Sequence, residues 1–195
     1  LAEAEIEGLI ADIRARNVEA IAVSLLFSFL NQAHERRLGE ALREAFPDKP
    51  GYLSSEVLPE IREIERTSTT SVCDYVGPIL ASYLARLEED VTGIGLPKIY
   101  VMGSNGGVFE AAEGVAMPAM AVESGPAAGV VATSRGANPS DKRDIRSVDM
   151  GGPTAKASLI RDGQYETTPE YEVGGGASEN RVMNGTGQPI RGPVI

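Results

Sequence analysis

An aspartate followed closely by two glycines and a threonine is the part of this chain best suited to chemistry. Asp149, Gly151, Gly152 and Thr154 lie in the stretch RSVDMGGPTAKASLI, residues 146–160, between two strand-like runs. Paired glycines leave backbone N–H groups open in a turn, where phosphate oxygens can accept hydrogen bonds. The Asp149 carboxylate could hold Mg²⁺ through water or orient an attacking water. The stretch therefore predicts a phosphate loop.

Neighbouring residues could extend this loop. Lys156 would add a positive charge, and Gly125 lies in a second glycine-rich stretch, ESGPAAGV at 123–130, which enters a helix. The first N–H groups of a helix bind anions. An ordinary hairpin in which Asp149 accepts turn hydrogen bonds explains the same short motif, and small residues at 123–130 equally allow a helix to pack closely on a sheet. The residues alone leave these alternatives open.

Other reactive side chains give weaker signals. His34 is the only histidine and Cys73 the only cysteine, which excludes an internal disulfide and a multi-cysteine metal site. We interpret His34 as a capping or packing residue and Cys73 as a buried thiol. Ser124 has no histidine partner in reach by sequence, which excludes a serine hydrolase. Asn105 favours a tight turn over a ligand contact, and the glycines at 174–176 form a loop that could gate a cleft.

Apolar periodicity predicts alternating helices and strands that position these residues. The expected helices cover about 6–16, 32–46 and 67–90, with another starting near Pro126, and the expected strands cover 20–27, 52–57, 99–104, 145–150, 155–160 and 162–166. Asn17 ends the first helix and Asn31 can cap the second. The order helix, strand, helix, strand at the start predicts a parallel sheet, and Asp162-Gly163 predicts a hairpin turn near the end. We expect the apolar run at 20–30 to be a buried strand.

Composition excludes several classes of function. The chain has 195 residues, and its 28 acidic against 18 basic residues give a formal net charge of −10, which argues against nucleic acid as a partner. The apolar run at 20–30 is shorter than the roughly 20 residues of a membrane crossing, and no signal peptide precedes it. A soluble protein of the cytoplasm is therefore expected, and both ends of the sequence fit a fragment of a larger protein.

Six stretches carry a resemblance to a known family. They are NQAHERR at 31–37, YLSSEVLPEIREIERTSTTSV at 52–72, SNGGV at 104–108, ESGPAAGV at 123–130, DMGGPTAKASLI at 149–160 and GTGQPIRGPVI at 185–195. In order and spacing the chain resembles the hydantoinase A/5-oxoprolinase family over nearly its whole length. The resemblance implies an α/β chain with the actin-like ATPase fold, in which two ribonuclease-H-like lobes each give one phosphate loop. It assigns 1–66 to the end of the first lobe, 67–143 to a crossing helix and connecting segment, and 144–195 to the start of the second lobe.

The resemblance also implies a function. Members of the family open cyclic amides such as hydantoins or 5-oxoproline at the expense of ATP, and close relatives are subunits of ATP-dependent ketone carboxylases. The implied cofactors are ATP and Mg²⁺, and the implied partners are a small cyclic amide and a subunit of the hydantoinase B type. The positions carried over by motif are Asp149, Gly151, Gly152 and Thr154. Together with the residues discussed above, the predicted site has Asp149 and Thr154 for catalysis, Asp149 for Mg²⁺ through water, and Gly125, Gly151, Gly152 and Lys156 for the nucleotide.

Departures from the family pattern keep a second function open. Pro153 stands where relatives usually carry threonine, and it removes both a hydroxyl and a backbone donor. Asn184 and Gln188 stand where relatives often carry histidine. Because the first phosphate loop is expected upstream of Leu1, we predict that the 195-residue piece alone neither hydrolyses ATP nor opens a hydantoin. The alternative is a non-catalytic nucleotide-binding or subunit-interface module.

Overall fold

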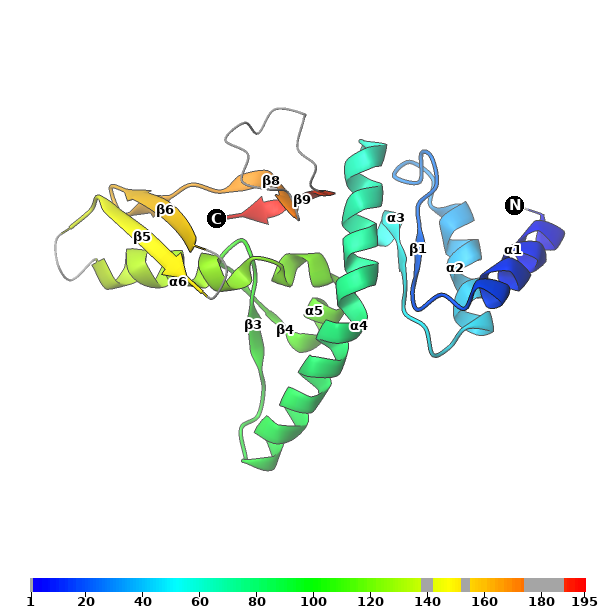
Figure 1. Ribbon diagram of the computed structural model, residues 1–195, viewed down its shortest axis with the longest axis horizontal. Helices are drawn as coiled ribbons and strands as arrows, with labels where there is room; N and C mark the ends of the chain where they lie inside the picture. The colour runs from blue at the N-terminus through cyan, green and yellow to red at the C-terminus, as the bar shows by residue number, and fades with distance from the viewer. Residues whose placement is uncertain (1, 138–141, 152–154, 174–187) are drawn as a thin grey trace. The chain divides into compact units, whose positions relative to one another are not determined.

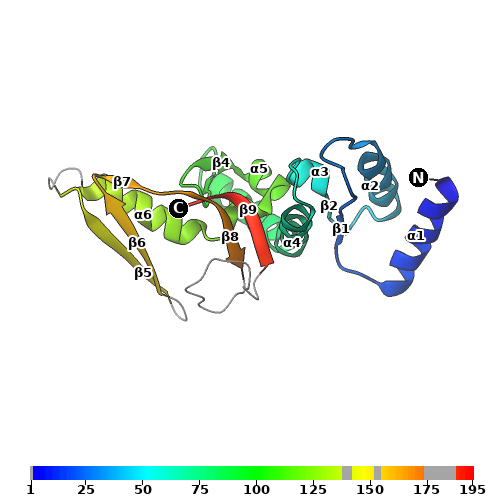
Figure 2. The ribbon, with the colours of Figure 1, turned by 90° about the horizontal axis from the view of Figure 1, so that it is seen from above.

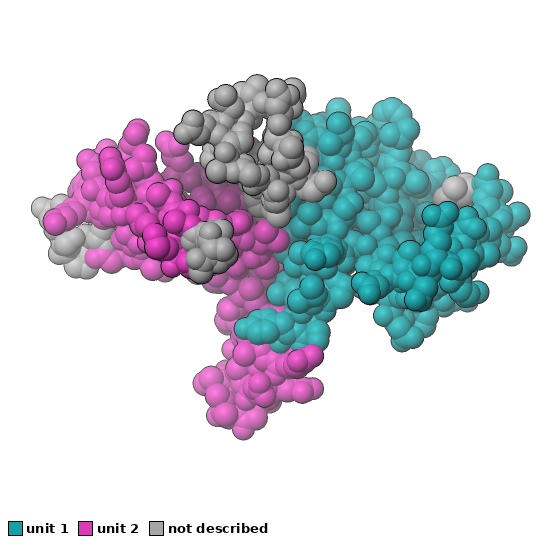
Figure 3. Space-filling view, viewed as in Figure 1, with its two compact units in different colours: residues 1–83, 116–119, 172–191 teal, residues 84–115, 120–171, 192–195 magenta. Residues whose placement is uncertain are grey.

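The computed structural model describes residues 2–137, 142–151, 155–173 and 188–195 (Figure 1). The chain divides into two compact units. Unit 1 comprises Leu1–Tyr83, Ala116–Ala119 and Glu172–Arg191, and unit 2 comprises Leu84–Val115, Met120–Tyr171 and Gly192–Ile195 (Figure 3). Helices and strands occur in both, so the chain is of the α/β class, as the sequence predicted.

Unit 1 is built on two parallel strands between helices. The elements are α1 (Glu3–Arg16), β1 (Ile21–Val23), α2 (Ala33–Ala45), β2 (Gly51–Leu53), α3 (Ser54–Val57) and the start of α4 (Glu63–Gly93). Ile21 pairs with Gly51 and Val23 with Leu53 in parallel register, which confirms the predicted parallel pair. Asn17 ends α1 in the left-handed conformation, with φ of 48°, as predicted.

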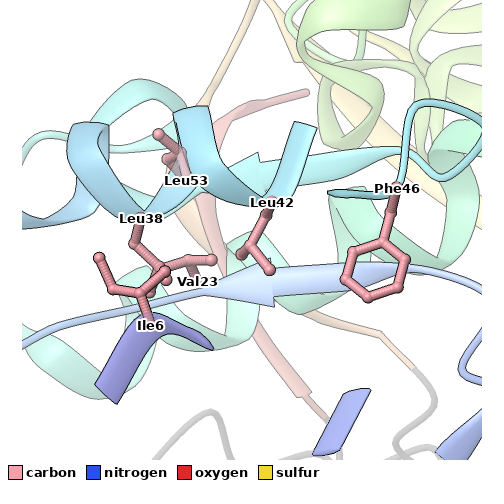
Figure 4. Close-up of a cluster of buried hydrophobic side chains, with 6 residues drawn as sticks. All are labelled: Ile6, Val23, Leu38, Leu42, Phe46 and Leu53. Atoms are coloured by element: carbon pink, nitrogen blue, oxygen red, sulfur yellow. The ribbon is translucent and has the colours of Figure 1, made fainter. Parts of the chain in front are cut away.

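The core of unit 1 lies where α1 and α2 meet these strands. It consists of Ile6, Val23, Leu38, Leu42, Phe46 and Leu53, each at most 8% exposed (Figure 4). Burying a side chain of this size contributes about 1.5–3 kcal/mol before entropy is subtracted. Gly39 permits the close approach of α2 to β2, because a Cβ there would lie 2.8 Å from Cδ1 of Leu53.

Two predicted strands of unit 1 are wrong in extent. The strand expected at 20–27 ends at Val23, and the buried run expected at 20–30 continues as turns that leave Leu26, Phe27 and Leu30 between 64% and 76% exposed. The strand expected at 52–57 ends at Leu53, where α3 begins. In both places a polar side chain from another helix binds the backbone that the strand would have used: Glu35 binds the N–H groups of Leu25 and Ser55, and Arg66 binds the carbonyl of Leu25.

Unit 2 holds the predicted hairpins. Its elements are β3 (Tyr100–Met102), β4 (Val108–Glu110), α5 (Ala111–Ala116), α6 (Ser124–Ala137), β5 (Ile145–Met150), β6 (Ala155–Arg161) and β7 (Gln164–Tyr165). The residues of a 3₁₀ turn (Pro118–Ala121), β8 (Thr168–Val173) and β9 (Gln188–Val194) are divided between the two units. β5, β6 and β7 form one antiparallel sheet, which confirms the strands predicted over 145–168. Asp162 and Gly163 both have positive φ, as a tight hairpin turn requires.

Helix α6 packs against the first hairpin of this sheet, and Figures 1 and 2 both show it alongside β5 and β6. The hydroxyls of Thr133 on α6 and Ser147 on β5 lie 3.2 Å apart, and Ser134 donates to the carbonyl of Gly163 at 2.9 Å. These contacts fix the helix by its C-terminal half. The N-terminal end of α6 therefore lies toward the turn end of the hairpin, where β5 runs into Gly151.

Within the part of the chain that the structure describes, no helix combines the length and the apolar character that a membrane crossing needs.

Candidate phosphate site

Asp149 and Lys156 face each other at the turn end of the β5–β6 hairpin. They are directly paired in the antiparallel register, which places both side chains on one face of the sheet. Ser147, two residues before Asp149, points to that same face and contacts α6. Asp149 is exposed, so its carboxylate can reach a ligand. The two charged residues therefore share the sheet face that carries α6.

The start of α6 joins this pair. Glu123, directly before the helix, forms an ion pair with Lys156, and both side chains are about one-third exposed. Glu123 has a φ of +66°, an uncommon conformation for a residue with a side chain. Gly125 lies in the first turn, and a Cβ at that position would meet nothing within 4 Å. Because the first N–H groups of a helix lack acceptors within it, this end of α6 suits an anion.

The glycine turn itself is only partly described. Gly151 is exposed, and a Cβ there would meet nothing within 4 Å, so a ligand can approach its backbone. Gly152, Pro153 and Thr154 lie outside the described residues, and their roles stay predictions. The same holds for the glycines at 174–176, for Asn184 and for the side chain of Gln188.

A metal at this end of the hairpin would have at most two protein carboxylates among the described residues. The described residues contain no group of three or more His, Cys, Asp and Glu side chains that could hold a metal ion. Mg²⁺ in nucleotide sites commonly keeps several waters and takes one or two carboxylates together with phosphate oxygens. Asp149, exposed at the end of β5, fits that kind of donor set.

The SNGGV stretch forms a tight turn, as predicted for Asn105. The Oδ1 atom of Asn105 accepts a hydrogen bond of 2.9 Å from the backbone of Gly107. Gly106 has a φ of +78°, and a Cβ there would lie 2.8 Å from Cγ2 of Val131, so only glycine fits. This turn packs against α6, the helix that also contacts β5 and β6.

Sequence reasoning missed a buried polar cluster in unit 1, here called the Glu35 cluster: Glu35, Ser54 and Arg66. Oε1 of Glu35 accepts from the backbone of Leu25 and the hydroxyl of Ser54, each at 2.7 Å, and Oε2 accepts from the backbone of Ser55 at 2.8 Å. Burial raises the pKa of Glu35, but these hydrogen bonds outweigh it and hold the pKa below its ordinary value. Glu35 is thus a satisfied, ionised group.

Arg66 completes the Glu35 cluster from α4. Its Nε donates to the Ser54 hydroxyl at 3.0 Å, one terminal nitrogen donates to the carbonyl of Leu25 at 2.8 Å, and the same group pairs with Glu63. Glu35 thus binds the N–H group of Leu25 and Arg66 binds its carbonyl, so neither group is available to extend β1 beyond Val23. A signal was present in the sequence, because Glu35 falls on the buried stripe of α2 with Leu38, Gly39 and Leu42.

Cys73 and Asp74 form a second polar feature of unit 1. Cys73 is fully buried, as predicted, and burial raises the pKa of its thiol to about 11. Burial also raises the pKa of Asp74 to about 6, against a smaller lowering by a hydrogen bond from the backbone of Ile21. Oδ1 of Asp74 is buried and has no hydrogen-bond partner among the described residues.

His34 is exposed at the start of α2.

Two solved structures share this architecture. The nucleotide-free structure of acetone carboxylase matches with a TM-score of 0.78 and 25% identity over 86% of this chain and 24% of its own. The ATP-dependent caprolactamase from Pseudomonas jessenii matches with a TM-score of 0.65 and 31% identity over 80% of this chain and 23% of its own. The class of protein that fold and site define is an α/β protein with the actin-like ATPase fold, as predicted.

Sequence comparison gives the family. The Hydantoinase/oxoprolinase model matches residues 66–187, and the model of the Hydantoinase/oxoprolinase N-terminal region matches residues 1–46. The chain belongs to the hydantoinase/oxoprolinase family, which confirms the resemblance. It is 37% identical to the caprolactamase subunit alpha of Pseudomonas jessenii over 84% of this chain, and 26% identical to the 5-oxoprolinase of Saccharomyces cerevisiae over 89%. It spans 24% and 13% of those two proteins.

Proposed function

We propose that the full-length protein opens a cyclic amide in an ATP-dependent reaction and that this chain supplies one of its phosphate loops. The observation that carries the proposal is that Asp149, Lys156 and the start of α6 lie together at the turn end of the β5–β6 hairpin. The relatives named caprolactamase and 5-oxoprolinase support the substrate class, since both names denote enzymes acting on a ring amide.

In this proposal each described residue has a defined task. Asp149 would hold Mg²⁺ through water, and the N–H groups of Gly125 and Gly151 would donate to phosphate oxygens. Lys156 would neutralise phosphate charge after exchanging Glu123 for the nucleotide. Gly152 and Thr154 are proposed to complete the loop. When bound, ATP supplies the phosphoryl group that makes an unstrained amide carbonyl reactive toward water.

The proposed enzyme has further parts. We propose that residues 1–66 belong to the first lobe, 67–143 to the crossing helix and connecting segment, and 144–195 to the second lobe, which brings the loop to a nucleotide held between lobes. Relatives named as subunits, including a caprolactamase subunit alpha and an acetone carboxylase beta subunit, support a partner subunit. We propose that this partner is of the hydantoinase B type and that the complex acts in the cytoplasm.

A ketone carboxylase subunit is the second candidate. Acetone carboxylase gives the higher TM-score, 0.78 against 0.65, and the acetophenone carboxylase gamma subunit is 30% identical over 74% of this chain. Both activities use ATP to activate an otherwise inert carbonyl, so the same phosphate loop serves either. The two candidates differ in the acceptor and not in the chemistry proposed for Asp149 and Lys156.

Substrate-dependent ATP turnover distinguishes the candidates. The full-length protein with its partner subunit is supplied with Mg-ATP and, separately, with hydantoin, 5-oxoproline, caprolactam, or acetone with bicarbonate. We expect ADP release to rise with a cyclic amide and to be lost in Asp149→Asn. A rise only with the ketone and bicarbonate would favour the carboxylase. ATP turnover that no acceptor stimulates, and that survives Asp149→Asn, would contradict the proposal and favour the non-catalytic module.

A further inference from the structure

A groove of about 810 Å³ lies in unit 2 between the last turns of α4 and the segment that runs from Pro97 into α5. Small or apolar residues such as Ala85, Ile99 and Ala112 line it. None of these residues belongs to the proposed phosphate site. The groove is therefore a second feature of unit 2 that the reaction does not explain.

The charges around the groove are unbalanced. Glu88, Glu89, Glu110 and Lys98 are the ionisable residues that line it. The Lys98 ammonium lies 2.6 Å from Oε1 of Glu110, so these two charges neutralise each other. The carboxylates of Glu88 and Glu89 remain, and they give the groove a net negative charge.

Glu88 and Glu89 lie just before the last turn of α4. The C-terminal end of a helix carries partial negative charge, and cations stabilise it. The last turn of α4 contains no basic residue that could do so. A cation from another polypeptide would be stabilised by the glutamates and by the helix end together.

Exposed apolar side chains accompany this charge. Ile94 is 76% exposed, Leu96 53% and Tyr100 58%, and each lies within a few residues of the groove lining in sequence. Large exposed apolar side chains are common at protein interfaces. Apolar surface together with unpaired carboxylates is complementary to a segment that presents both lysine or arginine and apolar side chains.

We propose that this groove, formed by the end of α4 and residues 97–112, binds a basic and partly apolar segment of a partner subunit. The proposal rests on the proposed function only in requiring a partner subunit, which the subunit names of several relatives support. Glu88 and Glu89 would pair with the partner's cations, and the small side chains of the floor would receive its apolar residues.

The test is binding between the full-length chain and its purified partner subunit, measured by calorimetric titration. We expect Glu88→Lys/Glu89→Lys to weaken binding about tenfold or more and wild-type affinity to fall with added salt. The matched control is Glu40→Lys/Glu44→Lys on α2, which makes the same charge change at exposed positions of unit 1 and should shift affinity by less than about twofold. Equal effects of the two double variants would overturn the proposal.

A steric variant and hydrogen exchange complete the test. Ala85→Trp should fill the groove at an exposed position and weaken partner binding without lowering the unfolding temperature. Amides of residues 88–93 are already hydrogen-bonded within α4, so the informative quantity is the change in exchange when the partner is added. Amides of residues 88–99 should exchange more slowly with the partner than in the full-length chain alone, and unchanged exchange would overturn the proposal. ATP turnover is measured separately, so its absence would contradict the proposed function and not the groove.

Discussion

Each unit of this protein brings a carboxylate and a cation close together, but the two arrangements differ in exposure. In unit 1, Glu35 and Arg66 are both 0% exposed, and backbone groups and Ser54 satisfy them. In unit 2, Asp149 is exposed, and Lys156 and Glu123 are each about one-third exposed. Buried charges with satisfied hydrogen bonds order a fold, while exposed charges beside a hairpin turn can exchange partners. The comparison favours a structural role for the Glu35 cluster and is consistent with the ligand-binding role proposed for Asp149 and Lys156.

The largest expected effect is the loss of Glu35. Glu35→Ala leaves the backbone donors of Leu25 and Ser55 without their acceptor. It also removes the acceptor of the Ser54 hydroxyl, through which Glu35 is linked to Arg66. Removing one member of a buried charged network costs about 3–5 kcal/mol, measured as the free energy of unfolding in urea. Arg37→Ala, which breaks an exposed ion pair of 2.7 Å with Glu3, is the control and should cost less than about 1 kcal/mol. Similar losses in both variants would contradict the architectural role.

A second effect concerns pH. The folded-state pKa of Asp74 is raised from 3.8 to about 6, so folding favours the protonated carboxyl. The stability that this protonated carboxyl contributes is fully present below about pH 4 and is lost as the pH rises through 6, by roughly 3 kcal/mol at most. Asp74→Asn should remove this pH dependence and raise stability at pH 7. If the free energy of unfolding changes with pH between 4 and 8 in the same way for wild type and Asp74→Asn, this prediction is refuted.

Changes at the ion pair of unit 2 should alter nucleotide binding and leave stability nearly unchanged. Lys156→Met removes the cation, and we expect Mg-ATP affinity of the full-length protein to fall about tenfold, or about 1.4 kcal/mol. Glu123→Gln frees Lys156 and should strengthen affinity a few-fold. Fluorescence titration measures both, and urea unfolding should show shifts within about 0.5 kcal/mol. Weaker binding in both variants would show that the ion pair itself holds the site.

The smallest effect is expected at Pro153. Pro153→Thr restores a hydroxyl and a backbone N–H to the glycine turn, and we expect tighter Mg-ATP binding or faster turnover by a few-fold. Proline has a fixed φ near −65° that suits a turn, so wild type should remain a weakened but usable loop. Isothermal titration of the full-length variant decides the point. Unchanged affinity and turnover would mean that Gly151, Gly152 and Thr154 supply every donor that matters.

Local patterns predicted the hairpins well and long-range polar contacts poorly. The alternating residues of β5 and β6 and the Asp162-Gly163 turn carry their own signal, so the sheet of unit 2 could be predicted. The end of β1 could not, because it depends on Arg66, 41 residues after Leu25. The pairing of Lys156 with Glu123 was missed for the same reason. The sequence motif predicted the residues of the candidate site, but it did not predict that Lys156 forms an ion pair with Glu123.

The most direct test of the central claim is a Mg-ATP titration of the full-length protein and its Asp149→Asn variant, with and without Mg²⁺. Asp149→Asn keeps the size of the side chain and removes its charge at an exposed position, so folding should be unchanged. The account predicts that the wild type binds ATP more tightly with Mg²⁺ and that the variant loses this gain, by about tenfold in affinity. Equal Mg²⁺-dependent binding by both proteins would contradict it and leave the hairpin as a structural turn.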